Sequence, residues 1–77
     1  MPTVLRIGKF RFFFYSNEHL PKHIHVECDD GVAKFSLISC ELVKAKRLNA
    51  TEINGIRKLV VENKGQLINK WDEYFNN

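Results

Sequence analysis

The stretch Pro21–Glu27 limits the folds open to this chain, because from His23 onward it alternates strictly between polar and apolar residues. This period of two is typical of a β-strand with one buried and one open face, since successive side chains point to opposite faces. His23, His25 and Glu27 would share the open face. They are the first candidates for a functional site, although a solvated, histidine-rich face with Glu27 paired to a lysine would give the same pattern.

Two runs rich in β-formers, residues 4–7 and 10–15, flank a Gly-Lys pair and predict a β-hairpin with a two-residue type II′ turn. Its core face would pair Ile7 with Phe10, Leu5 with Phe12 and Thr3 with Phe14. Its open face would hold Tyr15 and pair Arg6 with Arg11 and Val4 with Phe13. Two opposed arginines repel each other unless an anion or an aromatic ring lies between them, so the pair is either solvated or an anion site.

A second hairpin is predicted around Asp30-Gly31, a strong turn signal between residues 23–28 and 32–38. Its core face would pair Cys28 with Ala33, Val26 with Phe35 and Ile24 with Leu37. On its open face, Glu27 would lie opposite Lys34 and His25 opposite Ser36. Both hairpins then have one apolar face and one polar face, and this agreement supports the predicted register.

The C-terminal part reads as a helix from about residue 50 to about residue 75. Asn49 and Glu52 have the spacing of an N-cap with its acidic partner. An apolar stripe follows at helical spacing: Ile53, Ile56, Val60, Leu67, Trp71 and Tyr74. Gly65 could kink or divide the helix, but the stripe keeps its phase across it. We therefore expect one long helix.

These elements predict a single α+β domain over residues 1–77. An antiparallel meander of four strands at about residues 3–43 would be covered on one face by the helix, and residues 41–43 are an alternative short fifth strand. The apolar content of 44% supports a real core. Two cysteines are too few for a disulfide scaffold, and we see no signal peptide or membrane span, so we expect a cytoplasmic protein.

The open face would be basic and aromatic. The net charge is +3, and the first 48 residues carry eight Lys and Arg against five Asp and Glu. Platforms for single-stranded RNA combine flat rings with basic side chains, which makes the RNA-binding candidates Arg6, Arg11, Phe13, Tyr15 and Lys34. A protein interface, with a second copy or another partner, is the alternative reading of exposed rings.

The histidines admit two chemistries. Residues two apart on a strand are roughly 6.5–7 Å apart, a span that could bracket a phosphodiester, so His25 and His23 are the catalytic candidates for general acid–base cleavage of RNA. We expect His25, in the middle of its strand, to matter more than His23. The alternative is a zinc site completed by Glu27 or His19. A bare His-x-His is a weak metal signal, so we expect no metal and no cofactor.

The blocks RFFFYS and HIHVE, with AKFSL and NKWDEYF, resemble a small bacterial family of domains of unknown function over nearly the whole chain. The resemblance implies a protein often encoded beside a second small gene, in a toxin–antitoxin-like arrangement. It supplies no catalytic residues. Lys22 stands where the family commonly has a second proline, and Ser36 stands where an aromatic residue is frequent.

Two functions therefore remain open. The first is a toxin-like protein that binds or cleaves RNA on the open sheet face. The second is a non-catalytic interaction module that binds another copy of itself or the product of an adjacent gene.

Overall fold

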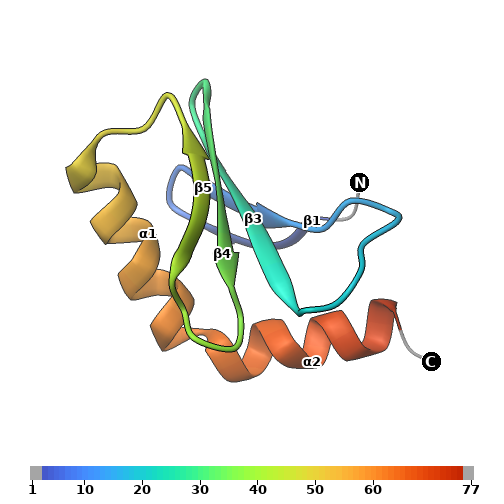
Figure 1. The fold of residues 1–77 in the computed structure, drawn as a ribbon. Coiled ribbons are helices and arrows are strands. Elements are labelled where there is room, and N and C mark those ends of the chain that lie inside the picture. The colour runs from blue at the N-terminus through green and yellow to red at the C-terminus, as the bar shows by residue number, and fades with distance from the viewer. Residues whose placement is uncertain (1–2, 76–77) are drawn as a thin grey trace.

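The computed structural model describes residues 3–75, which form a five-stranded antiparallel sheet and two helices (Figure 1). The strands follow one another in the order β1-β2-β3-β4-β5, so the sheet is a simple meander. Their bounds are β1 Thr3–Ile7, β2 Phe10–Phe13, β3 His23–Cys28, β4 Gly31–Ser36 and β5 Leu42–Lys46. The α+β class and the meander are confirmed. The fifth strand forms and extends to residue 46, beyond the alternative at residues 41–43, so Lys44 and Lys46 belong to the sheet.

The first hairpin has the predicted turn and pairs Ile7 with Phe10, Arg6 with Arg11 and Leu5 with Phe12. Gly8 has a φ of 57°, a value that suits glycine at the first turn position. Beyond Leu5 the register shifts, and Thr3 pairs with Phe13 rather than Phe14. The predicted pairs Val4–Phe13 and Thr3–Phe14 are therefore wrong, because a bulge in β1 takes up one residue.

The second hairpin turns at Asp29-Asp30, one residue earlier than predicted. Cys28 pairs with Gly31, and the register places His25 opposite Lys34 and His23 opposite Ser36. A Cβ atom on Gly31 would lie 2.5 Å from the carbonyl oxygen of Arg47, so this glycine serves a close backbone approach inside β4 rather than the turn. The register differs from the prediction by two residues, which leaves every side chain on its predicted face.

The C-terminal stripe forms two helices, α1 Ala50–Glu62 and α2 Lys64–Tyr74, rather than one long helix. The division lies at Asn63, whose φ is −111°, and not at Gly65. The Asn63 side-chain amide donates to the carbonyl of Leu59 and so completes the end of α1. The predicted N-cap is confirmed, since Asn49 and Glu52 form a reciprocal capping box.

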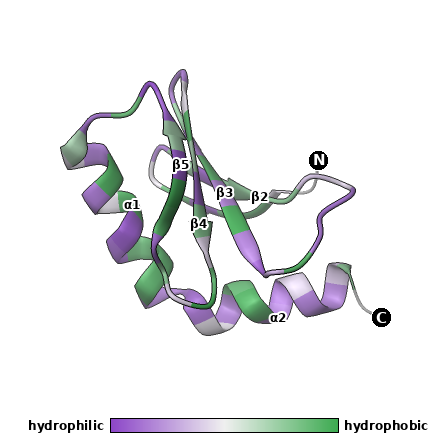
Figure 2. Ribbon diagram, in the orientation of Figure 1, coloured by the Kyte–Doolittle hydropathy of each residue, from purple (hydrophilic) through white to green (hydrophobic). Residues whose placement is uncertain are grey.

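The bend between the helices lets both cover the same side of the sheet. In Figure 1, α1 runs beside the sheet and α2 turns beneath its lower end. Figure 2 shows apolar and polar segments alternating along the strands and helices, as expected of elements buried on one side. The core consists of Phe12, Phe14, Ile24, Val26, Ala33, Phe35, Leu37, Ile56, Val60, Leu67 and Trp71. Within residues 3–75, neither helix is long and apolar enough to cross a membrane.

Candidate functional site

The face of the sheet opposite the helices carries two rows of cross-strand neighbours. One row runs from β1 to β5 through Arg6, Arg11, Glu27, Val32 and Lys46. The next row runs through Thr3, Phe13, His25, Lys34 and Lys44. All seven residues chosen from the sequence lie on or beside this face. Their contacts, however, differ from those predicted.

Arg11 is already engaged within the chain. Its Nε lies 2.7 Å from Glu27 Oε1, its Nη1 donates to the hydroxyl of Thr3, and its guanidinium lies 4.3 Å from the centroid of the Phe13 ring. Glu27 was expected to pair with Lys34, and that expectation is wrong because Arg11 occupies the carboxylate. Arg11 is thus a structural residue of this face, and its charge is largely neutralised.

Phe13 was expected to be an exposed ring, and it is only 3% exposed. It lies outside the main core, beneath a second aromatic layer, where it stacks on His25 at 5.5 Å and meets the edge of Tyr15 at 5.4 Å. The side chain does face the predicted side of the sheet. Tyr15 is 43% exposed, so of these two rings it alone offers a stacking surface.

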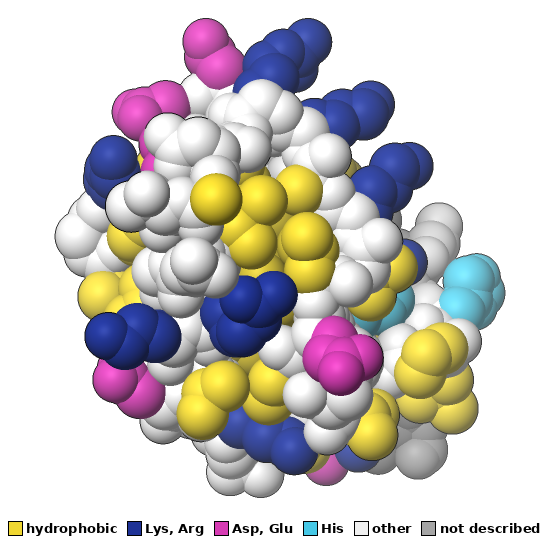
Figure 3. Space-filling view, turned by 60° about the vertical axis from the view of Figure 1, so that its left-hand side comes forward, with side chains coloured by type: hydrophobic (Ala, Val, Ile, Leu, Met, Phe, Trp, Pro, Cys, Tyr) yellow, Lys and Arg dark blue, Asp and Glu magenta, His cyan; other side chains and the backbone are white. Residues whose placement is uncertain are grey.

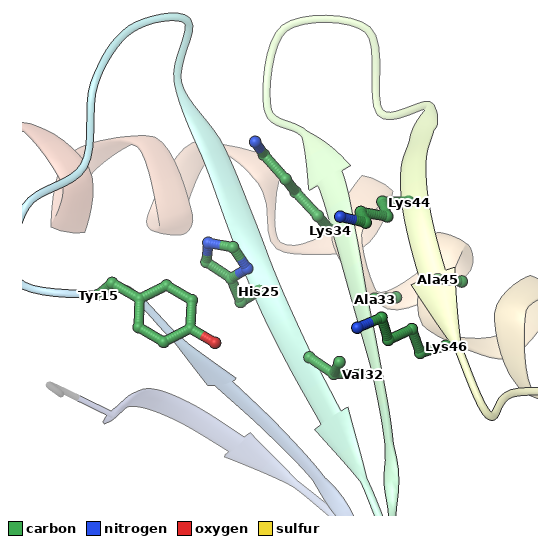
Figure 4. Close-up of a pocket in the computed structure, with 8 residues that line it drawn as sticks. All are labelled: Tyr15, His25, Val32, Ala33, Lys34, Lys44, Ala45 and Lys46. Atoms are coloured by element: carbon green, nitrogen blue, oxygen red, sulfur yellow. The ribbon is translucent and has the colours of Figure 1, made fainter.

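The lysine groove is a hollow of about 300 Å³ on this face, defined by Lys34, Lys44 and Lys46 together with Tyr15 and His25. Figure 4 shows Lys44 and Lys46 extending from β5 across β4, toward the side on which Tyr15 and His25 lie. In the space-filling view of Figure 3, Lys and Arg side chains project side by side from one edge of the molecule. Lys34 lies directly opposite Lys44, and none of the three lysines forms an ion pair within the described residues.

The two histidines converge on a carboxylate that the sequence did not single out. Glu18, in the loop between β2 and β3, places Oε1 2.7 Å from His23 Nε2 and Oε2 2.8 Å from His25 Nε2. We call these three residues the Glu18 cluster. Both imidazoles are nearly buried, with exposures of 6% for His23 and 9% for His25. They therefore do not bracket an open space between them, as the two-histidine cleavage mechanism requires.

Local hydrogen bonds orient the Glu18 cluster. The Tyr15 backbone N–H donates to Glu18 Oε2 over 2.9 Å. His23 Nδ1 lies 2.8 Å from the carbonyl oxygen of Pro21, and since a carbonyl only accepts, this nitrogen carries the proton. His23 Nε2 is thereby directed at the carboxylate. Ser36, which was expected to lie opposite His25, lies opposite His23 instead, and its hydroxyl accepts hydrogen bonds from the backbone N–H groups of Ile38 and Ser39.

The electrostatics of the cluster separate its members. Burial raises the pKa of Glu18, but the hydrogen bond from Tyr15 and the two histidines outweigh burial and hold that pKa below its usual value of 4.5. Burial lowers the pKa of His25, and the charges of His23 and Lys34 lower it further against the attraction of Glu18. At neutral pH, Glu18 is therefore a carboxylate and His25 a neutral imidazole. Neither His19 nor Glu27, the predicted third metal ligands, belongs to this group.

Comparison with protein families adds one finding to this geometry. Residues 10–72 match the model of a family described as Domain of unknown function (DUF4160). The chain is a member of the DUF4160 family. The match runs from β2 into α2, so both the lysine groove and the Glu18 cluster lie within the DUF4160 domain. Searches of curated proteins and of solved structures gave no significant match.

Membership agrees with the resemblance drawn from the RFFFYS and HIHVE blocks, in that the family is one of unknown function. Glu18 could have been noticed in the sequence as the carboxylate of a short polar loop that leads through Pro21 into the histidine strand. Its contact with the histidines does not follow from sequence spacing. Glu18 lies in a loop five positions before His23, and only the conformation of that loop brings its carboxylate to the His23 ring.

Proposed function

We propose that this DUF4160 domain binds the phosphate backbone of RNA in the lysine groove. The observation that carries the proposal is the gathering of Lys34, Lys44 and Lys46 around one hollow with no carboxylate paired to them in residues 3–75. Lysine ammonium groups bind phosphate as point charges. A groove of this kind tracks a nucleic-acid backbone in many proteins that bind single strands.

The arrangement is unfavourable for the protein alone. Like charges directly opposite each other on neighbouring strands are destabilising, and Lys34 faces Lys44 in this way. An anion bound between them would convert this repulsion into attraction. The groove is therefore better suited to a phosphate than to an empty state.

The stacking contribution is smaller than the sequence suggested. Phe13 is buried and Arg11 is paired with Glu27, which leaves Tyr15 as the predicted aromatic residue with a free surface at the groove. Binding would rest mainly on backbone charge, with little sequence preference. We place this activity in the bacterial cytoplasm, as the resemblance implies.

Fluorescence anisotropy with a labelled single-stranded RNA tests the proposal. We expect Lys44→Ala to weaken binding about fivefold, the equivalent of about 1 kcal/mol. It should also reduce the slope of log K against log salt by about 0.7, the value expected when the protein neutralises one phosphate fewer on a single strand. Lys58→Ala, on the exposed face of α1, removes the same charge and should leave both quantities unchanged.

Two results would count against the groove. Equal weakening by Lys44→Ala and Lys58→Ala would show attraction to the net charge alone. An absence of RNA binding at low salt would refute the proposal outright, and it would leave the interaction module as the function.

RNA cleavage is a second candidate, favoured by the position of His25. This histidine lines the lysine groove, and its lowered pKa keeps it in the neutral form that a general base requires. The binding mixtures can be analysed on a denaturing gel for shortened RNA. If cleavage occurs, His25→Ala should abolish it. Intact RNA after prolonged incubation would limit the function to binding.

The partner proposed for the chain is the product of an adjacent gene, in the toxin–antitoxin-like arrangement. Its support in the fold is the free edge of the sheet at β5, where Val43 is 57% exposed. An exposed strand edge presents unpaired backbone groups to which another strand can add.

A further inference from the structure

The Glu18 cluster contains a buried nitrogen without a hydrogen-bond partner. His25 Nε2 lies 2.8 Å from Glu18 Oε2, but the geometry is not that of a hydrogen bond, and the atom is left unpaired within the described structure. Buried polar groups are nearly always satisfied, because an unsatisfied one keeps the full cost of losing water. This nitrogen is therefore directed at a partner that the protein chain does not supply.

The other possible ligand atoms of the cluster, His23 Nε2 and the Glu18 carboxylate oxygens, lie near this nitrogen. His23 Nε2 and a Glu18 oxygen lie 2.7 Å apart, and one ligand atom from each of the three residues lies within 4.8 Å of the others. Donor atoms around a tetrahedral ion with bonds of 2.0–2.1 Å would be about 3.3 Å apart. The two contacts between the carboxylate and the imidazole nitrogens, 2.7 and 2.8 Å, are shorter than this value, so the side chains would have to move slightly apart to seat an ion among them.

We propose that Glu18, His23 and His25 bind a divalent transition-metal ion, for which Zn²⁺ is the simplest probe. Two imidazole nitrogens and one carboxylate form a ligand set that suits zinc and related metals. Oxygen-rich sites are what Mg²⁺ and Ca²⁺ require, so this cluster should discriminate against both. Three protein ligands leave a further position for water or substrate.

The surroundings of the cluster are those of a metal site. A ligating histidine usually donates its second ring N–H to a carbonyl or carboxylate, and His23 Nδ1 makes this bond to Pro21. The Tyr15 backbone N–H holds the Glu18 carboxylate in the same manner. Both ligands are thus oriented before any ion binds.

An ion would also have a path to the cluster. Glu18 and His23 line a hollow of about 420 Å³, and His25 lines the lysine groove. Lys34 borders both hollows, so the two lie next to each other. A metal held here would have its remaining position close to the proposed binding place of the RNA backbone, although the metal site does not depend on that function.

The test uses the full chain, stripped with a chelator and titrated with Zn²⁺ alone. Calorimetry should give one ion per chain. Thermal unfolding should show a rise in Tm of about 10 °C or more when free Zn²⁺ is about one hundred times its Kd. Mg²⁺ at the same concentration should leave Tm unchanged.

Variants locate the ion. Glu18→Gln keeps the size of the side chain but removes its charge, and it should weaken Zn²⁺ binding at least about tenfold. His19→Ala, next to it in the loop and exposed, is the matched control and should bind as the wild type does. Equal loss in both variants, or wild-type affinity in Glu18→Gln, would overturn the assignment.

Cobalt gives a second measurement on the wild-type protein. It keeps the proposal testable even if a variant does not fold. Co²⁺ in the cluster should show visible bands without a thiolate charge-transfer band, since its protein ligands are nitrogen and oxygen. The second group that could hold a metal, Cys28, Asp29 and Glu52, would show the thiolate band. That band, or no change in Tm at any Zn²⁺ concentration, would refute the proposal and leave the cluster as a hydrogen-bonded structural group of the fold.

Discussion

Cys28 is the last residue of β3, the strand that carries the histidines, and its buried side chain is 1% exposed. Burial raises the pKa of its thiol, against the attraction of Lys9 and with support from Asp29 and Glu52. The thiol is therefore neutral at physiological pH. Cys40 is only partly buried, so the two cysteines differ in access as well.

The raised pKa of Cys28 predicts an effect of pH on the stability of the fold. An acid whose pKa is higher in the folded state stabilises the fold below its usual pKa, here 9.0, and this contribution is lost as the pH rises through the folded value. We expect the free energy of unfolding of the wild type to fall more steeply than that of Cys28→Ala between neutral and alkaline pH. Urea denaturation at several pH values measures it.

Thiol labelling provides the control for that measurement. With a thiol reagent at pH 8, Cys40 should react first and Cys28 only as the chain unfolds. Equally fast labelling of both cysteines in the native protein would contradict the burial of Cys28.

At the residue scale, the sequence identified the histidines but not the residue that joins them. Alternation alone places His23 and His25 on one face, because the period of a strand is fixed. Glu18 reaches them from a loop, and a loop path depends on contacts far along the chain. Burial of Phe13 was missed for a related reason, since it depends on the rings of Tyr15 and His25, which contact Phe13 and each other.

At the scale of elements, the absence of a side chain at Gly31 lets the second hairpin pack closely against residues 47 and 48, which lead into α1. A Cβ atom there would meet the Arg47 carbonyl oxygen and a Leu48 methyl carbon at 2.5 Å, and the backbone atom cannot move away cheaply. We expect Gly31→Ala to lower the free energy of unfolding by about 1–3 kcal/mol, as overpacking does.

Gly55→Ala is the matched control for Gly31→Ala. Gly55 lies inside α1, and a Cβ atom there would have no neighbour within 4 Å. Alanine in a helix interior is favoured over glycine by about 0.5–1 kcal/mol, so this variant should be stabilised. Chemical denaturation of both proteins gives the comparison, and two losses of equal size would disprove the role of the close approach.

Gly31 also explains the error in the predicted register of the second hairpin. Asp-Gly is the usual sign of a two-residue turn, but here the glycine is needed inside the strand, and Asp29 takes the positive φ of 54° instead.

The division of the helix at Asn63 could not be predicted either. The apolar stripe keeps its phase through the bend, so periodicity alone does not reveal it.

At the scale of the molecule, β5 is one of the two outer strands of the sheet, and its free edge is a surface at which another chain could add. Two copies joined along this edge would bring Lys44 and Lys46 of each copy close together, and edge lysines oppose such pairing. We expect the chain alone to be a monomer at micromolar concentration, measured by light scattering after gel filtration. A stable dimer would contradict this expectation.

The partner proposed above, the product of an adjacent gene, would bind through this edge. Val43→Lys, on β5, should abolish co-purification of the two proteins. Val61→Lys, on α1 and equally exposed at 55%, should leave it intact.

The meander, the helix-covered face and the basic open face all followed from periodicity and charge, whereas a partner depends on a surface that the chain alone does not specify.

The position of Trp71 makes the Glu18 cluster visible to spectroscopy. The chain has a single tryptophan, it is 4% exposed, and its ring centroid lies 5.1 Å from that of His23. Indole emission responds to charge and polarity in its immediate surroundings, so a proton, an ion or a ligand arriving at His23 changes the light that the unmodified protein emits. The fold thus contains its own fluorophore at the site of interest, and events there can be followed in real time without a label.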